Sequence, residues 1–370
     1  MRTFLKIPSL VPSLFLSGKR PRKNQGRTKD EPKNAKSQNV RFIKIAILFL
    51  SLIPCLIPPR DNRENTERRA TELFYKNSRF FTQILHISKK SRIFAAQRLY
   101  KTMLIPKIHS IQSISTKYNT GDEPVLVLCS DKRQYICKYM RSSATIAYKL
   151  ACEYIGAQLA AIWKIHTPQV AFVNILPAHW ETVNVPHSLS APAIGFQKLD
   201  NVIDITPTFT QIAANKKTLM QLLKIALFDF WITNEDRTYN NANLLYDLEN
   251  EDLVSIDYGG ILNNVSFDYT SQQLTETDSI LCADLSAHLL TSVSVKDIED
   301  TLSILKAEYQ QIVNTARKKI ESISQEMPKE WALPANKVLD KLKELVESKW
   351  VEDTWNNFVE CLKSNSNYGK

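Results

Sequence analysis

Glycine is scarce in this chain, at only 8 of 370 residues, which excludes glycine-rich fibrous and low-complexity proteins. The 6 cysteines form no CxxC pair and no metal-like spacing with histidine, so we expect buried thiols in a reducing compartment rather than disulfides. Because 44% of the residues are hydrophobic and 23% are charged, the chain can bury a large core. Its length suggests two domains, or one domain with extensions.

Acidic residues are few at the start of the chain. Residues 1–102 contain 23 Lys or Arg and 6 Asp or Glu, a balance of +17, whereas the rest contains 25 and 32, a balance of −7. The net charge of +10 therefore comes entirely from the first 102 residues. We expect no direct nucleic-acid binding by the chain as a whole.

Residues 1–102 are predicted to form a non-globular, disordered basic extension, because residues 18–41 are too polar to bury a core. The apolar stretch within residues 42–59 is shorter than the roughly 20 residues that a spanning helix needs, and Pro54 interrupts it. We therefore expect a cytoplasmic protein and keep membrane tethering through 42–59 as the alternative. Met103 opens the first orderly segment, so a start codon assigned too early would explain the extension.

From residue 123 the pattern becomes regular. Pro124–Leu128 and Gln134–Tyr139 are typical of two strands in an antiparallel hairpin. A helix is expected from about Ala144 to Lys164, followed by a strand over Gln169–Ile175. Strand, strand, helix and strand is the order of a protein-kinase N-lobe.

Such a lobe needs a lysine on the strand before the helix, paired with a carboxylate on that helix. Lys138 and Glu153 meet both conditions. The lysine would hold the phosphates of ATP, and the glutamate would fix the lysine. Taken singly, each residue has a simpler explanation, a solvated strand lysine and a surface glutamate.

A strongly apolar helix is predicted over Lys216–Ile232, and a dense polar loop follows it. Phosphoryl transfer needs a carboxylate to orient the attacking hydroxyl, an oxygen ligand for Mg²⁺ a few residues later, and a second carboxylate across a hairpin. Asp236, Asn241 and Asp257 supply these groups in that order. The alternatives are a polar turn with a surface salt bridge at the first site and an ordinary strand-ending turn at the second.

Glycines follow the second carboxylate. Gly259 and Gly260 are expected to let the backbone turn close to the nucleotide. The phosphate loop is poor by comparison, because residues 118–123 contain a single glycine, Gly121.

Three segments carry a resemblance to the HipA-like kinase family, within the protein-kinase-like and phosphatidylinositol-kinase-like superfamily. They are Phe228–Thr238, Asn241–Leu245 and Ile256–Gly260. The resemblance runs from Met103 to about Trp331. It implies that Lys138, Glu153, Gly121 and Gln197 bind ATP, that Asp236 is the catalytic base, and that Asn241 and Asp257 hold Mg²⁺.

The resemblance also implies a fold and a set of partners. The fold would be α+β and bilobal, with a small antiparallel N-lobe over 103–200 and a mostly helical C-lobe over 201–332. Residues 333–370 follow the resemblance, and their helical spacing predicts a helical appendage or C-lobe packing, with a partner-binding surface as the alternative. Helices are expected over Val295–Glu321 and Asn336–Lys363. The phosphate acceptor would be a protein Ser or Thr hydroxyl, with a small molecule as the alternative. A toxin-like role would call for a separate antitoxin-like protein.

Two other functions compete with an active kinase. One is a catalytically silent kinase fold that serves as a binding module, against which the intact Asp236, Asn241 and Asp257 speak. The other is a membrane-tethered or DNA-binding protein that works through residues 1–102.

Overall fold

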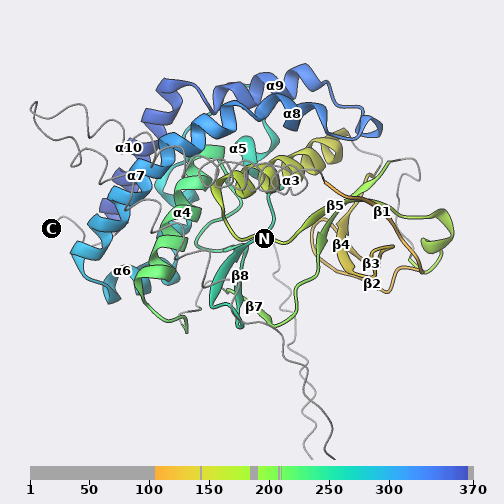
Figure 1. Cartoon of the computed structure of the whole chain (residues 1–370), viewed down its shortest axis with the longest axis horizontal. Coiled ribbons are helices and arrows are strands. Elements are labelled where there is room, and N and C mark those ends of the chain that lie inside the picture. The colour runs from red at the N-terminus through yellow and green to blue at the C-terminus, as the bar shows by residue number, and fades with distance from the viewer. Residues whose placement is uncertain (1–104, 142–143, 184–190, 207–208, 210, 366–370) are drawn as a thin grey trace, which may run out of the picture. The chain divides into compact units, whose positions relative to one another are not determined.

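The computed structural model describes residues 105–141, 144–183, 191–206, 209 and 211–365 (Figure 1). The predictions for the basic extension, the apolar stretch within 42–59 and Met103 lie outside the described residues. No helix in the described part of the chain is long and apolar enough to cross a membrane.

The N-terminal part is built on a six-stranded sheet of order β1-β5-β6-β4-β3-β2. Its strands are β1 (Lys107–His109), β2 (Thr116–Lys117), β3 (Val125–Leu128), β4 (Gln134–Lys138), β5 (Val170–Asn174) and β6 (Ala193–Gln197). All neighbours are antiparallel except β1 and β5. The predicted hairpin is confirmed, since β3 and β4 pair with Leu126 opposite Ile136.

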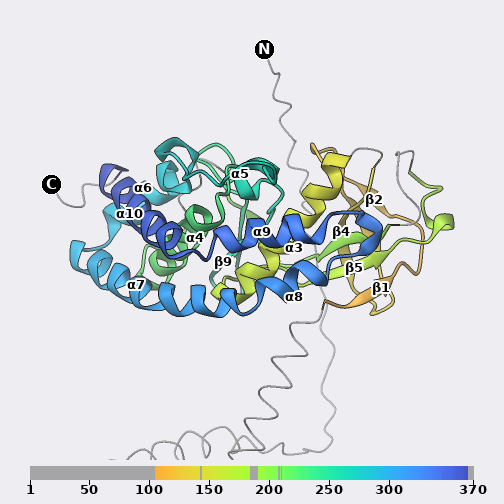
Figure 2. The ribbon, with the colours of Figure 1, turned by 90° about the horizontal axis from the view of Figure 1, so that it is seen from above.

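One long helix, α3 (Ala144–Trp163), follows β4 as predicted. Figures 1 and 2 show α3 between the six-stranded sheet on one side and helices α4, α6, α7 and α10 on the other. Its alanines and single glycine allow close packing, and Leu150, Tyr154 and Trp163 are fully buried or nearly so. The helix therefore links both lobes and carries residues into the space between them.

The C-terminal part combines a small sheet with helices. The antiparallel strands β7 (Val202–Asp204), β8 (Leu244–Asp247) and β9 (Asp252–Ser255) form the sheet. The helices are α4 (Lys216–Ile232), α5 (Ile261–Val265), α6 (Asp284–Ser292), α7 (Val295–Arg317), α8 (Ile320–Gln325), α9 (Ala335–Glu344) and α10 (Ser348–Asn365). Short 3₁₀ turns lie at Pro177–His179, Glu276–Asp278, Ile280–Cys282 and Lys329–Trp331. The architecture is the expected α+β one, with a small sheet lobe and a helical lobe.

The two helical segments expected near the C-terminus are each broken in two. The break between α9 and α10 has a tertiary cause: the Leu345 carbonyl accepts the Trp231 indole N–H at 2.6 Å, and the Val346 carbonyl accepts from Arg317 at 2.5 Å. Beyond the break, Phe358 of α10 is fully buried with its ring centroid 5.9 Å from that of Phe230 in α4. Through this contact α10 packs against α4.

Candidate active site

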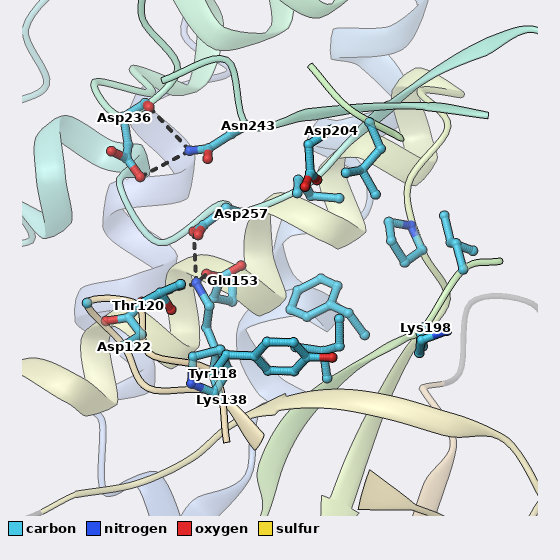
Figure 3. Close-up of a pocket in the computed structure, with 18 of the residues that line it drawn as sticks. Tyr118, Thr120, Asp122, Lys138, Glu153, Lys198, Asp204, Asp236, Asn243 and Asp257 are labelled. Carbon is cyan, nitrogen blue, oxygen red and sulfur yellow. Dashed lines mark hydrogen bonds and ion pairs between the residues drawn. The ribbon is translucent and has the colours of Figure 1, made fainter. Parts of the chain in front are cut away.

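Lys138, at the end of β4, is the centre of the site. Its ammonium group forms ion pairs with Glu153 of α3, with Asp257 at 2.8 Å and with Asp122 at 3.1 Å. Glu153 is fully buried, and its other carboxylate oxygen accepts the backbone N–H of Tyr258 at 2.9 Å. Figure 3 shows Lys138 reaching from the sheet toward Asp257 and Glu153. The predicted Lys138–Glu153 contact is thus present.

Lys138 stabilises the negative charges around it, but Glu153 is hard to ionise: burial and the charge of Asp257 raise the pKa of Glu153 to about 8, and the Lys138 ammonium opposes the rise. Burial opposes the charge on Lys138, but the carboxylates of Glu153, Asp257 and Asp122 raise its pKa above the ordinary value. Burial likewise opposes ionisation of Asp257, yet the Lys138 ammonium lowers the pKa of Asp257 to about 2. Asp257 therefore stays ionised at physiological pH.

The second part of the site is the loop after α4. That helix ends at Thr233, whose left-handed φ of 51° turns the chain out of the helix. Asp236 follows, and two amide side chains hold its carboxylate: Asn241 donates at 3.1 Å and Asn243 donates at 3.1 Å to the other oxygen (Figure 3 shows the Asn243 bonds). Both amides also donate to the Asp236 backbone carbonyl. The loop thus fixes the orientation of this carboxylate.

The pKa of Asp236 is shifted in the direction that makes it a better base. Burial and the negative charge of Asp257 raise it, while the amide donors of Asn241 and Asn243 oppose the rise. The net change is upward from the ordinary aspartate value. A carboxylate in this state accepts a proton more readily than one in water.

A buried ion pair supports the loop that carries Asp236. Arg237 is fully buried and pairs with Asp229 of α4, which also accepts from Asn234 at 3.0 Å. The guanidinium group further donates to the Ser255 hydroxyl at 2.7 Å and to the Ile256 carbonyl at 2.8 Å. The alternative of a surface salt bridge at this position is therefore wrong: Arg237 ties α4 to the end of β9.

The glycines after Asp257 serve close packing. The left-handed φ falls on Asp257 itself, at 57°, and not on either glycine. A Cβ at Gly260 would lie 2.4 Å from the Cβ of Asp236, and one at Gly259 would lie 3.1 Å from a carboxylate oxygen of Glu153. The expectation that Gly259 and Gly260 provide the turn is thus corrected: they let the two halves of the site approach each other.

A cleft of about 810 Å³ brings all seven predicted site residues together. Its lining includes Gly121, Lys138, Glu153, Gln197, Asp236, Asn241 and Asp257. Gln197 lies at the end of β6, where its backbone N–H donates to the Gln169 carbonyl at 2.8 Å and its side chain accepts from Arg133. A Cβ at Gly121 would meet no atom within 4 Å, so this position does not require glycine.

Three residues of the site were not singled out from the sequence. Asp122 and Lys149 line the cleft beside Lys138, and Asn243 orients Asp236. The spacing of Lys149, four residues before Glu153, does place both on one helix face, which is a signal that the sequence carries. The residues next to Asp122 in sequence give no sign of its role, because its partners Lys138, Arg141 and Lys149 come close to it only in the folded chain.

A smaller cavity of about 220 Å³ adjoins Asp236. It is strongly polar, and its lining comprises Asp122, Lys149, Glu235, Asp236, Asp257, Gly259, Gly260 and Asn264. Because Asp236 and Asp257 line both cavities, the two carboxylates lie between them.

Comparison with known proteins gives one family match. The family described as HipA-like kinase matches residues 111–358. Among solved structures, the chain is similar to the Helicobacter pylori proinflammatory kinase CtkA, with a TM-score of 0.43 and 13% identity over 69% of this chain and 99% of that one. It is also similar to the Golgi casein kinase, with a TM-score of 0.36 and 12% identity over 70% and 74%. The same kinase with Mn/ADP bound gives 0.36 and 11% over 72% and 76%.

No curated protein matches the chain. The family match nevertheless covers more than half of the sequence and includes every predicted site residue. The chain belongs to the HipA-like kinase family.

Proposed function

We propose that the chain is an ATP- and Mg²⁺-dependent phosphotransferase in which Asp236 is the catalytic base. One observation carries the proposal: Lys138 joins Glu153 and Asp257 in the same cleft that holds an oriented Asp236. Phosphoryl transfer depends mainly on positioning and charge, and this arrangement provides both.

The cleft suits a nucleotide because its two ends differ. Lys138 and its carboxylate partners lie at one end (Figure 3). The rest of the lining includes Lys198 and Asp204 and is otherwise rich in apolar side chains: Ile136, Pro168, Phe196, Leu199, Val202, Leu245 and Ile256. The backbone N–H groups of Gln197 and Lys198 already donate to the carbonyls of Gln169 and Gln134, respectively. We therefore place the adenine edge against the backbone of Leu199, the next residue along, with Lys138 on the phosphates.

Asp257 and Asn241 fit a magnesium ion. Mg²⁺ binds oxygen ligands and is held by one or two carboxylates together with substrate phosphates. Asn241 donates to Asp236 through its amide nitrogen, so its carbonyl oxygen is available as a ligand. When bound, the ion would neutralise phosphate charge.

Asp236 is placed to accept the proton of the acceptor hydroxyl, and its raised pKa suits that role. The 220 Å³ cavity on which it borders is the proposed site of that hydroxyl. We propose a protein Ser or Thr side chain as the acceptor, on the basis of the family.

The test is phosphate transfer or release from γ-labelled ATP by the full chain. Activity should require Mg²⁺ and fall to background in Asp257→Asn. Asp200→Asn is the matched control, because its exposed carboxylate pairs with Lys198 and does not line the cleft. The proposal fails if the wild-type chain neither transfers nor releases phosphate, or if Asp257→Asn is as active as the control.

A further inference from the structure

Asp122 places a carboxylate among several cations. Its oxygens lie 3.1 Å from the ammonium nitrogen of Lys138, 3.4 Å from that of Lys149 and 3.9 Å from the guanidinium group of Arg141. Arg141 also donates to the Asp122 backbone carbonyl at 2.9 Å, which fixes the loop between β2 and β3. Three cationic groups thus lie within 3.9 Å of this one carboxylate, and two of them have other partners: Lys138 also pairs with Glu153 and Asp257, and Arg141 also pairs with Glu123.

Lys149 shares the space around Lys138. It lies one helical turn before Glu153 on α3, so both side chains extend from one face of that helix. Lys149 lines both the large cleft and the smaller cavity, as do Asp122 and Asp257. Lys149 thus lies where the proposed nucleotide and acceptor sites meet, whereas Lys138 lines the nucleotide site alone.

Two backbone N–H groups of the hairpin loop are already bonded within the loop. A glycine-rich loop binds phosphates through backbone N–H groups that point at the ligand. Here the Tyr118 N–H donates to the Pro124 carbonyl at 2.9 Å, and the Glu123 N–H donates to the Thr120 carbonyl at 3.0 Å. Gly121 has no left-handed φ that would turn further amides inward. Lys138 and Lys149, which both line the cleft, can supply full positive charge to the phosphates.

We propose that Lys149 is a second phosphate-binding cation of the nucleotide site, and that Asp122 competes with the phosphates for Lys138 and Lys149. This inference rests on the proposed function. A triphosphate carries several negative charges and can displace one carboxylate from two ammonium groups, but the displacement weakens nucleotide binding. Asp122 thus sets the affinity for phosphate-bearing ligands and leaves that for the nucleoside unchanged.

The test is calorimetric binding of Mg-ATP, Mg-ADP and adenosine to the full chain and its variants. Asp122→Asn removes the competing charge and should tighten Mg-ATP binding about three- to tenfold, whereas Lys149→Met should weaken it by about the same factor. Adenosine binding should stay the same in both. Glu123→Gln is the matched control, because it removes a carboxylate of the same loop that pairs with Lys117 and Arg141 and not with Lys138 or Lys149.

The inference is overturned if Asp122→Asn leaves Mg-ATP affinity unchanged or weakens it, since a weakening would make Asp122 a ligand of the nucleotide or its metal. It is also overturned if Lys149→Met binds Mg-ATP like the wild type, or if adenosine affinity changes as much as Mg-ATP affinity. A wild-type chain that binds no Mg-ATP overturns the proposed function as well, so the two failures are distinguishable.

Discussion

Gly260→Ala tests whether the two halves of the site must meet as closely as they do. The backbone at Gly260 has φ −99° and ψ 11°, which alanine can adopt, so the substitution adds one methyl group without backbone strain. That methyl carbon would lie 2.4 Å from the Cβ of Asp236. The perturbation is thus steric and is directed at the proposed base.

The size of the effect follows from contact distances. Carbon atoms pack at about 3.5–4.0 Å, so Asp236 and Gly260 must separate by roughly 1.1–1.6 Å. A misplacement of about 1 Å at a reacting group can reduce the rate by about 100-fold. Overpacking of this kind typically costs about 1–3 kcal/mol of unfolding free energy. We expect a clear loss of turnover in a protein that still folds.

The assay is steady-state release of phosphate from Mg-ATP, with thermal unfolding of the same samples. Asp200→Asn is the control, because its exposed carboxylate does not line the cleft, and it should keep wild-type turnover. A folded Gly260→Ala protein with turnover equal to that of Asp200→Asn would show that the close approach of Gly260 to Asp236 is not required for turnover.

Further predictions concern Asp236, the amide that orients it and the buried ion pair that supports its loop. Its raised pKa places the acid limb of kcat/KM above the ordinary aspartate value of about 3.9, since activity is lost as pH falls and the base is protonated. Asn243→Ala removes a donor that lowers this pKa, so the limb in a pH–rate profile should move to higher pH; a shift to lower pH would contradict the account. Asp229→Ala leaves Arg237 buried without its carboxylate, and urea unfolding should show a loss of about 3–5 kcal/mol; an unchanged midpoint would show that the ion pair does not support the fold.

Regular elements could be predicted where a periodic pattern is long. α4 begins and ends at the predicted residues, because its apolar run is bounded by the Asn215 cap and by a polar loop. The two-residue strand β2 and the three-residue strands β1 and β7 carry too little pattern to be recognised. The break after Glu344 depends on Trp231 and Arg317, which are distant in sequence and bond to the carbonyls there.

The candidate site was likewise only partly predictable from the sequence. Spacing within one segment and the chemistry of the groups suggested Lys138, Glu153, Asp236, Asn241 and Asp257, and all five line one cleft. The sequence did not show why the positions that support these five residues hold an arginine and two glycines. Burial of an arginine beneath the loop and the close approach of two glycines arise only when distant segments pack.

The role of Asp236 as the catalytic base is tested most directly by measuring nucleotide binding and turnover separately in Asp236→Asn. The amide keeps the shape of the side chain but cannot accept the proton of an acceptor hydroxyl. We expect the variant to bind Mg-ATP with nearly wild-type affinity while kcat falls at least about 100-fold. A variant that keeps wild-type kcat would contradict the assignment of Asp236 as the catalytic base.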